Sequence, residues 1–191
     1  MSNKVITFFN KKGGTGKTSF SFSVAKDLNY PLLSNDDSVI EEIYPSKAKI
    51  LEKLQLIDHD VVYDLGGFID EDAIEIFKGS SIVVVPTTLD INAIKRTINS
   101  VMEINAYCSN ILIVINRIKL DKLGKYRQSI EALKGLGKPI LHVRETEAIT
   151  NSIHLGKTIT ELYSENNFTK NQYKGIYHDY NKLLTEIKER I

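Results

Sequence analysis

A strand, a glycine-rich loop and a helix follow one another near the start of the chain, and this order restricts the possible folds more than any other feature. Residues 5–9 are an apolar run, residues 11–19 read Lys-Lys-Gly-Gly-Thr-Gly-Lys-Thr-Ser, and residues 20–25 continue as a largely apolar stretch. Glycine lets the backbone take positive φ values and approach a ligand closely. The backbone N–H groups of such a loop, at the positive end of a helix dipole, form a site for phosphate.

A lysine and a threonine at the end of this loop add the side chains that a nucleotide with magnesium requires. Lys17 is placed to contact the β- and γ-phosphates of a nucleoside triphosphate, and the hydroxyl of Thr18 is placed to bind Mg²⁺. The predicted cofactor-binding residues of the loop are therefore Gly13, Gly14, Thr15, Gly16, Lys17, Thr18 and Ser19.

Two lysines before the glycine pair distinguish this loop from the usual pattern G-x-x-x-x-G-K-S/T. Lys11 stands where that pattern has its first glycine, and Lys12 is an additional cation. Residues 12–18 resemble the deviant Walker A motif K-G-G-x-G-K-S/T of the ParA/MinD ATPase family. The resemblance implies ATP and Mg²⁺ as cofactors and an ATP-bound homodimer, in which Lys12 crosses the interface to the other subunit's nucleotide. Lys12 and Lys17 are thus candidate catalytic residues.

The composition is that of a globular protein with one core. The 191 residues suit a single domain, 1–191, and the apolar fraction of 42% is typical of such proteins. No apolar run approaches the roughly 20 residues that span a bilayer, and we expect no signal peptide before the first strand. The single cysteine, Cys108, excludes an internal disulfide, so we expect a cytoplasmic protein.

Apolar runs and amphipathic stretches alternate along the chain. This alternation predicts an α/β fold: a single-domain P-loop NTPase with a mostly parallel sheet flanked by helices on both faces. We expect strands at 5–9, 31–34, 59–64, 81–86, 110–116 and 139–143, and helices after the loop and at 46–54, 70–78, 90–105, 121–134 and 171–190.

Acidic residues follow the second predicted strand, at the edge of the sheet where ligands of parallel sheets bind. Residues 32–38 resemble the family's L-L-h-D-x-D-P-Q segment, so Asp37 matches the acid that orients the attacking water and is a third candidate catalytic residue. Asn35 and Ser38 depart from that segment, and the alignment leaves open whether Asp36 or Asp37 does this work. An Asx-rich turn without catalytic function is the alternative.

Asp64 ends the next strand and is followed by two glycines. The segment resembles the family's second strand motif, which implies that Asp64 is an outer-sphere partner of Mg²⁺. Gly67 would let the backbone lie close to the γ-phosphate. The less favoured alternative is that Asp64 only caps the strand end.

Asn116 and Arg144 end two later strands and are candidates for binding the nucleotide. Asn116 matches an asparagine that reads the base in relatives, and its amide can pair with N6 and N7 of adenine. Arg144 begins a stretch to residue 159 that resembles the family's P-R-x-x-x-x-x-E-A-x-x-x-G-K-P-I segment, with Val143 in place of the first proline. Asparagine is also common in turns after strands.

The resemblance spans roughly residues 4–160 and implies slow, partner-stimulated ATP hydrolysis in cargo positioning, most often plasmid or chromosome partition. It also implies nonspecific DNA binding, a centromere-binding partner and association with the nucleoid. The net charge is only +1, so DNA contact requires a local patch. Any one of the candidate basic residues could instead belong to a solvated helix face. The candidates for DNA contact are Lys119, Lys122, Lys125, Arg127, Lys170, Lys174, Lys182, Lys188 and Arg190.

Three alternatives remain. In the MinD-like branch a C-terminal amphipathic helix binds the membrane, but here acidic residues share the polar face, so we expect the closing helix to pack on the sheet. The same fold also serves small-molecule kinases and dethiobiotin-synthetase-like ligases. A scaffold that binds nucleotide without hydrolysis is the third. The iron–sulfur relatives need two bridging cysteines, which Cys108 alone excludes. The apolar stripe of the closing helix is Tyr180, Leu183, Leu184, Ile187 and Ile191.

Overall fold

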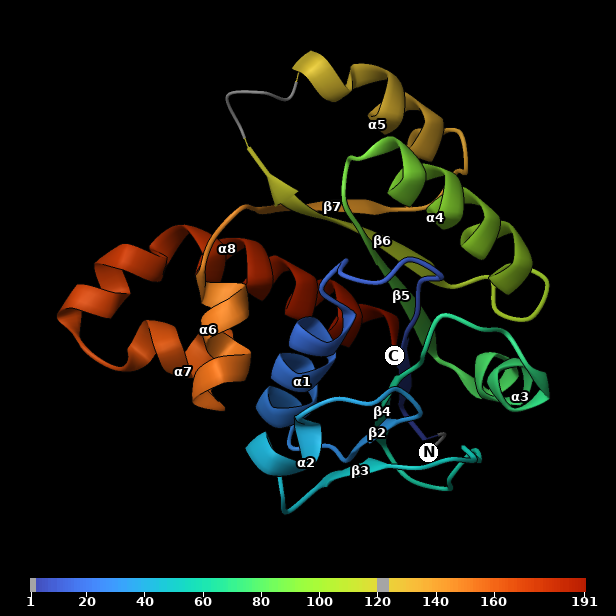
Figure 1. Cartoon of the computed structure of the whole chain (residues 1–191), viewed down its shortest axis with the longest axis horizontal. Helices are drawn as coiled ribbons and strands as arrows, with labels where there is room; N and C mark the ends of the chain where they lie inside the picture. The colour runs from blue at the N-terminus through green and yellow to red at the C-terminus, as the bar shows by residue number, and fades with distance from the viewer. Residues whose placement is uncertain (1–2, 120–123) are drawn as a thin grey trace.

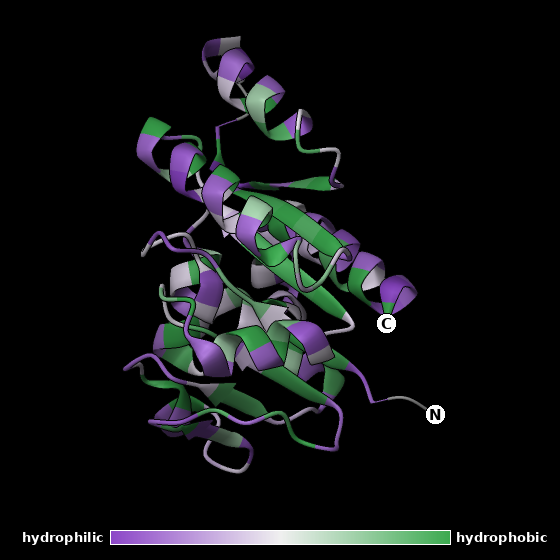
Figure 2. Cartoon of the chain, turned by 90° about the vertical axis from the view of Figure 1, so that its right-hand side faces the viewer, coloured by the Kyte–Doolittle hydropathy of each residue, from purple (hydrophilic) through white to green (hydrophobic). Residues whose placement is uncertain are grey.

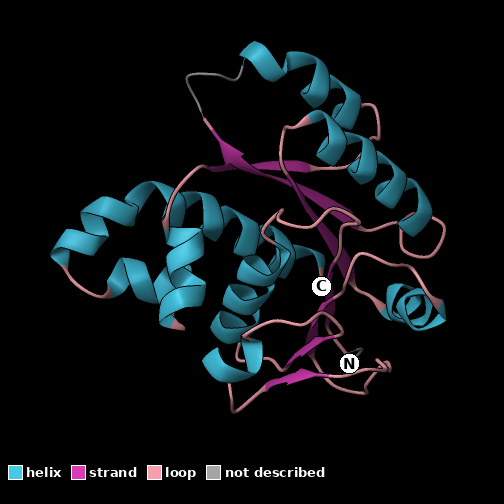
Figure 3. Cartoon of the chain, viewed as in Figure 1, coloured by secondary structure: helices cyan, strands magenta, loops and turns pink. Residues whose placement is uncertain are grey.

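A parallel β-sheet runs through the centre of the protein, as a computed structural model shows for residues 3–119 and 124–191 (Figures 1 and 3). In these residues the sheet has seven strands in the order β3-β2-β4-β1-β5-β6-β7. Every neighbouring pair is parallel, which confirms the predicted α/β fold. The strands are β1 (Val5–Phe8), β2 (Leu32–Ser34), β3 (Ala48–Ile50), β4 (Val61–Asp64), β5 (Ile82–Thr87), β6 (Ile111–Ile118) and β7 (Ile140–Arg144).

Helices cover both faces of the sheet, because alternate strand residues point to opposite sides. In β5, Ile82 and Val84 belong to one apolar cluster, and Val83 and Val85 belong to the other. The central strands β1, β4, β5 and β6 are therefore largely apolar on both faces (Figure 2), as expected of a buried parallel sheet. The first cluster includes residues of α1 (Lys17–Leu28), α2 (Ile40–Ile43), α6 (Ala148–Leu155), α7 (Ile159–Ser164) and α8 (Asn167–Arg190), and the second includes residues of α3 (Glu71–Gly79), α4 (Ile91–Ile104) and α5 (Arg127–Lys134).

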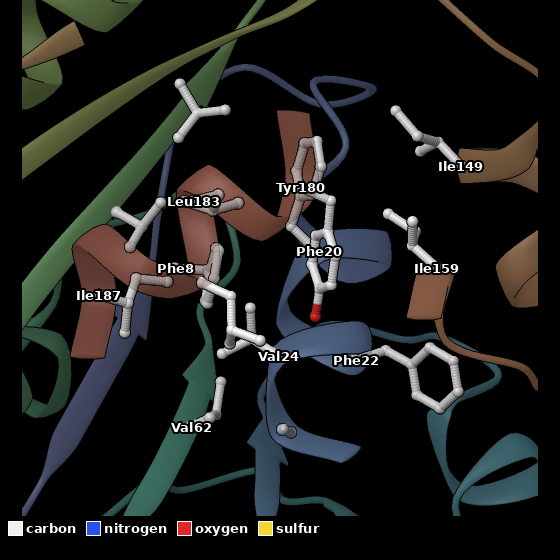
Figure 4. Close-up of a cluster of buried hydrophobic side chains, with 14 of the residues drawn as sticks. Phe8, Phe20, Phe22, Val24, Val62, Ile149, Ile159, Tyr180, Leu183 and Ile187 are labelled. Atoms are coloured by element: carbon white, nitrogen blue, oxygen red, sulfur yellow. The ribbon is translucent and has the colours of Figure 1, made fainter. Parts of the chain in front are cut away.

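The closing helix, α8, packs on the sheet as predicted. Tyr180, Leu183 and Ile187 are fully buried against residues of β1, β4 and α1 (Figure 4). The helix begins four residues earlier than expected because Asn166 caps it: its Oδ1 accepts hydrogen bonds from the N–H groups of Phe168 and Thr169. Across the residues that the structure covers, no helix is both long and apolar enough to cross a membrane.

The predicted helix at 46–54 is wrong. Residues 48–50 instead form β3, an edge strand that pairs in parallel with β2, with Leu32 opposite Ala48. The apolar spacing of Ile50 and Leu54 suits a helix, but pairing with β2 satisfies the backbone of this segment instead.

Other departures concern helix boundaries. The short helices α2, α6 and α7 were not expected. The described part of the predicted helix 121–134 begins as α5 at Arg127, and residues 121–123 lie outside the described ranges.

Truncating Leu183 tests whether α8 is part of the core. We expect Leu183→Ala to lower the free energy of unfolding by about 2 to 5 kcal/mol, because it leaves a cavity at a fully buried position. Phe168→Ala, at a 75% exposed position of the same helix, is the control and should change it by about 0.5 kcal/mol or less. Urea unfolding without lipid gives both values, and equal effects would contradict this packing.

Candidate nucleotide-binding site

The glycine-rich loop lies between β1 and α1 at the carboxyl edge of the sheet. Gly14 and Gly16 have φ values of 73° and 97°, which other residues rarely adopt. At Gly16 a Cβ atom would also lie 2.6 Å from Nδ2 of Asn116. Both glycines are therefore required by the backbone, and the helix that follows begins at Lys17 with its N–H groups directed at the loop.

The start of the loop is fastened to β5 and α4. The buried side chain of Asn10 donates from Nδ2 to the carbonyl of Pro86 and to Oγ1 of Thr97, both at 2.8 Å. Its Oδ1 accepts a hydrogen bond from the N–H of Lys12 at 2.9 Å. Lys11 forms an ion pair with Glu103 of α4 at 2.6 Å. The loop is thus held in place by protein contacts, which sequence reasoning did not identify.

A pocket opens above this loop and contains most of the residues predicted to bind phosphate. Lys17 lies at its base and is only 7% exposed, although among the described residues it forms no salt bridge. A buried, unpaired ammonium group favours binding of an anion. The pocket is lined by Gly13, Gly14, Gly16, Lys17, Thr18, Ser19, Asp36, Arg117, Ile149 and Thr150. Thr15, in the middle of the loop, is fully buried and is not among the lining residues.

Asp64 is fully buried at the end of β4, beside the start of α1. Burial raises the pKa of Asp64 to about 6, although nearby Thr18 and Lys17 act to lower it. Neither carboxylate oxygen receives a hydrogen bond of normal geometry from any described residue. Such a group needs a cation or a donor. Mg²⁺ prefers oxygen ligands and keeps several waters, so a site shared by Asp64, the Thr18 hydroxyl and a phosphate fits this ion.

The two acids after β2 occupy different positions. Both are exposed, but only Asp36 is among the residues that line the pocket. Ser34 fixes this turn, because its Oγ donates to the carbonyl of Asp64 at 2.9 Å and accepts from the N–H of Asp36 at 3.0 Å. Asp36 is therefore the acid that borders the predicted phosphate pocket. The assignment of the water-orienting role to Asp37 stays a prediction.

The loop after β4 lies against the glycine-rich loop. A Cβ atom at Gly67 would be 3.2 Å from the carbonyl oxygen of Lys11, so glycine permits this contact. The N–H of Gly66 donates to Oδ1 of Asn35 at 2.7 Å, which ties this loop to the turn after β2. Gly67 is thus beside the loop, as its predicted role requires.

Asn116 and Arg144 do not line the pocket. Asn116 is 1% exposed, and its Nδ2 donates to the carbonyl of Thr15 at 3.0 Å while its Oδ1 accepts from the N–H of Arg117 at 2.8 Å. The guanidinium of Arg144 instead forms two hydrogen bonds to Asp179 of α8, at 2.7 and 3.1 Å. In this structure both side chains have protein partners. Their assignment to the nucleotide remains a prediction.

Lys12 is also outside the pocket of its own loop. Its ammonium group lies close enough to Asp90, the N-cap of α4, to help lower the pKa of that carboxyl group, to which the Thr88 hydroxyl contributes most. Of the two lysines, therefore, Lys17 lines the pocket, whereas Lys12 does not and has its charge near Asp90.

Replacing Asp64 tests the burial of its charge. Because the folded state binds this proton more tightly than the unfolded state, the carboxyl group favours folding below pH 4 and loses that contribution as pH rises through about 6. We expect Asp64→Asn to stabilise the nucleotide-free protein by about 1 to 3 kcal/mol at pH 7.5 and by much less near pH 4. Urea unfolding at both pH values measures this, and a loss of stability at pH 7.5 would contradict the burial of an unpaired carboxylate.

Comparison with known proteins identifies similar folds but no close relative in sequence. No protein-family model matches the sequence, and no curated protein is similar to it at the level of a recognisable relative. A structure of apo McdA from Cyanothece has a TM-score of 0.67 at 12% identity, covering 92% of this chain and 98% of that one. A putative plasmid partition protein from Borrelia burgdorferi, bound to AMPPNP, has a TM-score of 0.66 at 16% identity over 95% of this chain and 99% of that one.

The cell division protein MinD from Aquifex aeolicus has a TM-score of 0.61 at 13% identity, covering 95% of this chain and 97% of that one. These identities are too low to transfer an activity, but the fold is the same over almost the entire chain. The protein therefore has the fold of the ParA/MinD ATPases, as its loop motif predicted.

Proposed function

We propose that this protein is an ATPase switch of the ParA/MinD type, which dimerises on ATP, hydrolyses it with Mg²⁺ and positions DNA or another cargo. The observation that carries the proposal is the pair of lysines on one loop: Lys17 is buried and lines the pocket, whereas Lys12 does not line it and has its charge near Asp90. A single lysine suffices to hold phosphate in an ordinary loop of this kind. The second lysine needs another use, and a nucleotide in a facing subunit provides one.

The residues of the pocket divide the work of binding the triphosphate. The N–H groups of the loop and of the first turn of α1 would hold the phosphates, and Lys17 would neutralise the β- and γ-oxygens. Thr18 and Asp64 would hold Mg²⁺, and this ion would neutralise charge that develops on the phosphate oxygens. The buried, unpartnered carboxylate of Asp64 supports this assignment.

Hydrolysis also requires an acid that orients water. Asp36 and Asp37 are both on the turn that Ser34 and Asn35 hold beside β4. The segment's likeness to the family motif favours Asp37, and closure of the turn around nucleotide would bring it nearer to the phosphates. Asp37→Ala should then bind ATP and turn it over slowly.

DNA would bind through basic side chains that other residues leave accessible. Lys119 is paired with Glu145, and Arg190 is paired with Glu186. Lys125 and Arg127, at the start of α5, are exposed, as are Lys174 and Lys188 on α8. Two subunits would double any such patch, so a monomer with little net charge does not argue against it. A partition partner that binds the centromere would supply sequence specificity and stimulate turnover.

Substituting the two lysines separately tests the switch. We expect Lys17→Ala to weaken ATP binding by roughly 10- to 100-fold, because the pocket loses its buried cation. The monomeric Lys12→Ala protein should have about the same affinity for ATP as the unmodified protein. It should neither dimerise nor hydrolyse ATP. Light scattering with ATP, in an Asp37→Ala background that preserves the nucleotide, measures the oligomeric state.

Lys11→Ala is the matched control, because it removes a neighbouring lysine that is already paired with Glu103. It should still dimerise with ATP. A protein that binds ATP and stays monomeric in every variant would rule out the dimer switch, and phosphate transfer to a small acceptor would favour a metabolic enzyme instead.

DNA binding should require ATP and weaken steeply with salt. We expect the affinity for random-sequence duplex to fall linearly with salt concentration on a log–log plot, because binding releases counterions. Replacing both Lys125 and Arg127 with alanine should make that slope shallower by roughly 1 for each lost phosphate contact in each subunit. Fluorescence anisotropy across salt concentrations measures this. No binding at low salt would remove the DNA-partition form of the proposal.

A further inference from the structure

Arg117 has an unusual backbone for a non-glycine residue. Its φ is 57°, in the left-handed region, and it lies in an irregularity of β6 between Ile115 and Ile118. The Oδ1 of Asn116 accepts the hydrogen bond of the Arg117 N–H at 2.8 Å and stabilises this conformation. Left-handed residues of this kind cost free energy and concentrate at functional sites. The turn of the chain leaves the Arg117 side chain exposed at the carboxyl edge of the sheet.

Arg117 is among the residues that line the phosphate pocket, whereas Asn116 is not. Arg117 also lines a second pocket, beside Asp90 and Lys119. Asn116 is 1% exposed, and each end of its amide already has one protein partner: the nitrogen donates to the carbonyl of Thr15, and the oxygen accepts from the N–H of Arg117. In the ranges 3–119 and 124–191 no hydrogen bond or ion pair occupies the Arg117 guanidinium. Of these two neighbours, only Arg117 lines the pocket, and its guanidinium has no partner among the described residues.

The order of the strands indicates which end of a nucleotide Arg117 would meet. Asp64 and Asp36 follow β4 and β2, on one side of the loop that follows β1. Arg117 is the penultimate residue of β6, on the opposite side, and Ile149 and Thr150 belong to α6, the helix that follows β7 in the chain and contacts α1. Mg²⁺ and the γ-phosphate belong beside Asp64 and Thr18. The nucleoside must then extend the other way, toward Arg117 and α6.

Resting on the proposed function, we infer that Arg117 contacts the base and ribose of the bound nucleotide, while Asn116 positions the loop and touches no part of the ligand. The planar guanidinium can stack on a purine ring and donate to the ribose at the same time. The buried side chain of Ile149, seen beside the loop in Figure 4, offers an apolar surface at the same end of the pocket.

Comparing ATP with tripolyphosphate, which lacks the nucleoside, tests this assignment by calorimetry without any activity measurement. We expect Arg117→Ala to weaken ATP and ADP binding by about tenfold and to leave tripolyphosphate affinity within about twofold. Arg117→Lys should recover little, because an ammonium group cannot stack as a guanidinium does. Lys53→Ala, which removes an exposed cation that is not among the residues lining this pocket, is the control and should bind all three ligands normally.

Asn116→Ala should behave differently, with weaker binding of ATP and tripolyphosphate alike, because the whole loop loses its contact at Thr15. Arg117→Ala with unchanged ATP affinity, or with equal losses for ATP and tripolyphosphate, would overturn the inference. So would an Asn116→Ala loss confined to ATP. Failure of the unmodified protein to bind ATP would instead overturn the proposed function, so the two failures are distinguishable.

Discussion

Two buried asparagines hold the glycine-rich loop, and the rest of the site depends on this restraint. Asn10 fastens its beginning to β5 and α4, and Asn116 fastens its middle to the end of β6. A loop with several glycines would otherwise lose much conformational entropy on binding a ligand. Because these amides fix it in advance, its N–H groups already face the pocket. Asn10 follows β1 and Asn116 is in β6, with β5 between these two strands in the sheet, so the position of the loop depends on the assembled sheet.

The same sheet brings the charged groups together around the loop. Asp64 and Asp36 come from β4 and the turn after β2, and Lys17 comes from the first turn of α1. Their arrangement leaves a buried ammonium group without a salt bridge and a buried carboxylate whose oxygens receive no hydrogen bond of normal geometry from the described residues. An unoccupied core would not keep such groups, since each costs free energy when unpaired. They are complementary to a phosphate and to a divalent cation, respectively.

The sequence predicts the sheet and the loop better than it predicts the surroundings of the loop. Periodicity and strand–helix alternation depend on local pattern, so the six expected strands are present with small changes at their ends. The strand β3 was missed because pairing with β2 overrides a helical apolar spacing. Asn116 was expected to read a base, but its partners are the carbonyl of Thr15, 101 residues earlier, and the next N–H. No local pattern reveals such a partner, or the left-handed backbone of Arg117.

The far end of α1 is fixed as firmly as its beginning. Asp27 accepts a hydrogen bond from the hydroxyl of Tyr180 in α8 at 2.9 Å and another from the hydroxyl of Thr160, in the first turn of α7, at 2.6 Å. The helix of 12 residues is about 18 Å long, so it works as a short rod between the glycine-rich loop and the helices at the C-terminal part of the chain. A displacement of the loop cannot be absorbed by sliding at Asp27. It must tilt the rod or carry α7 and α8 along with it.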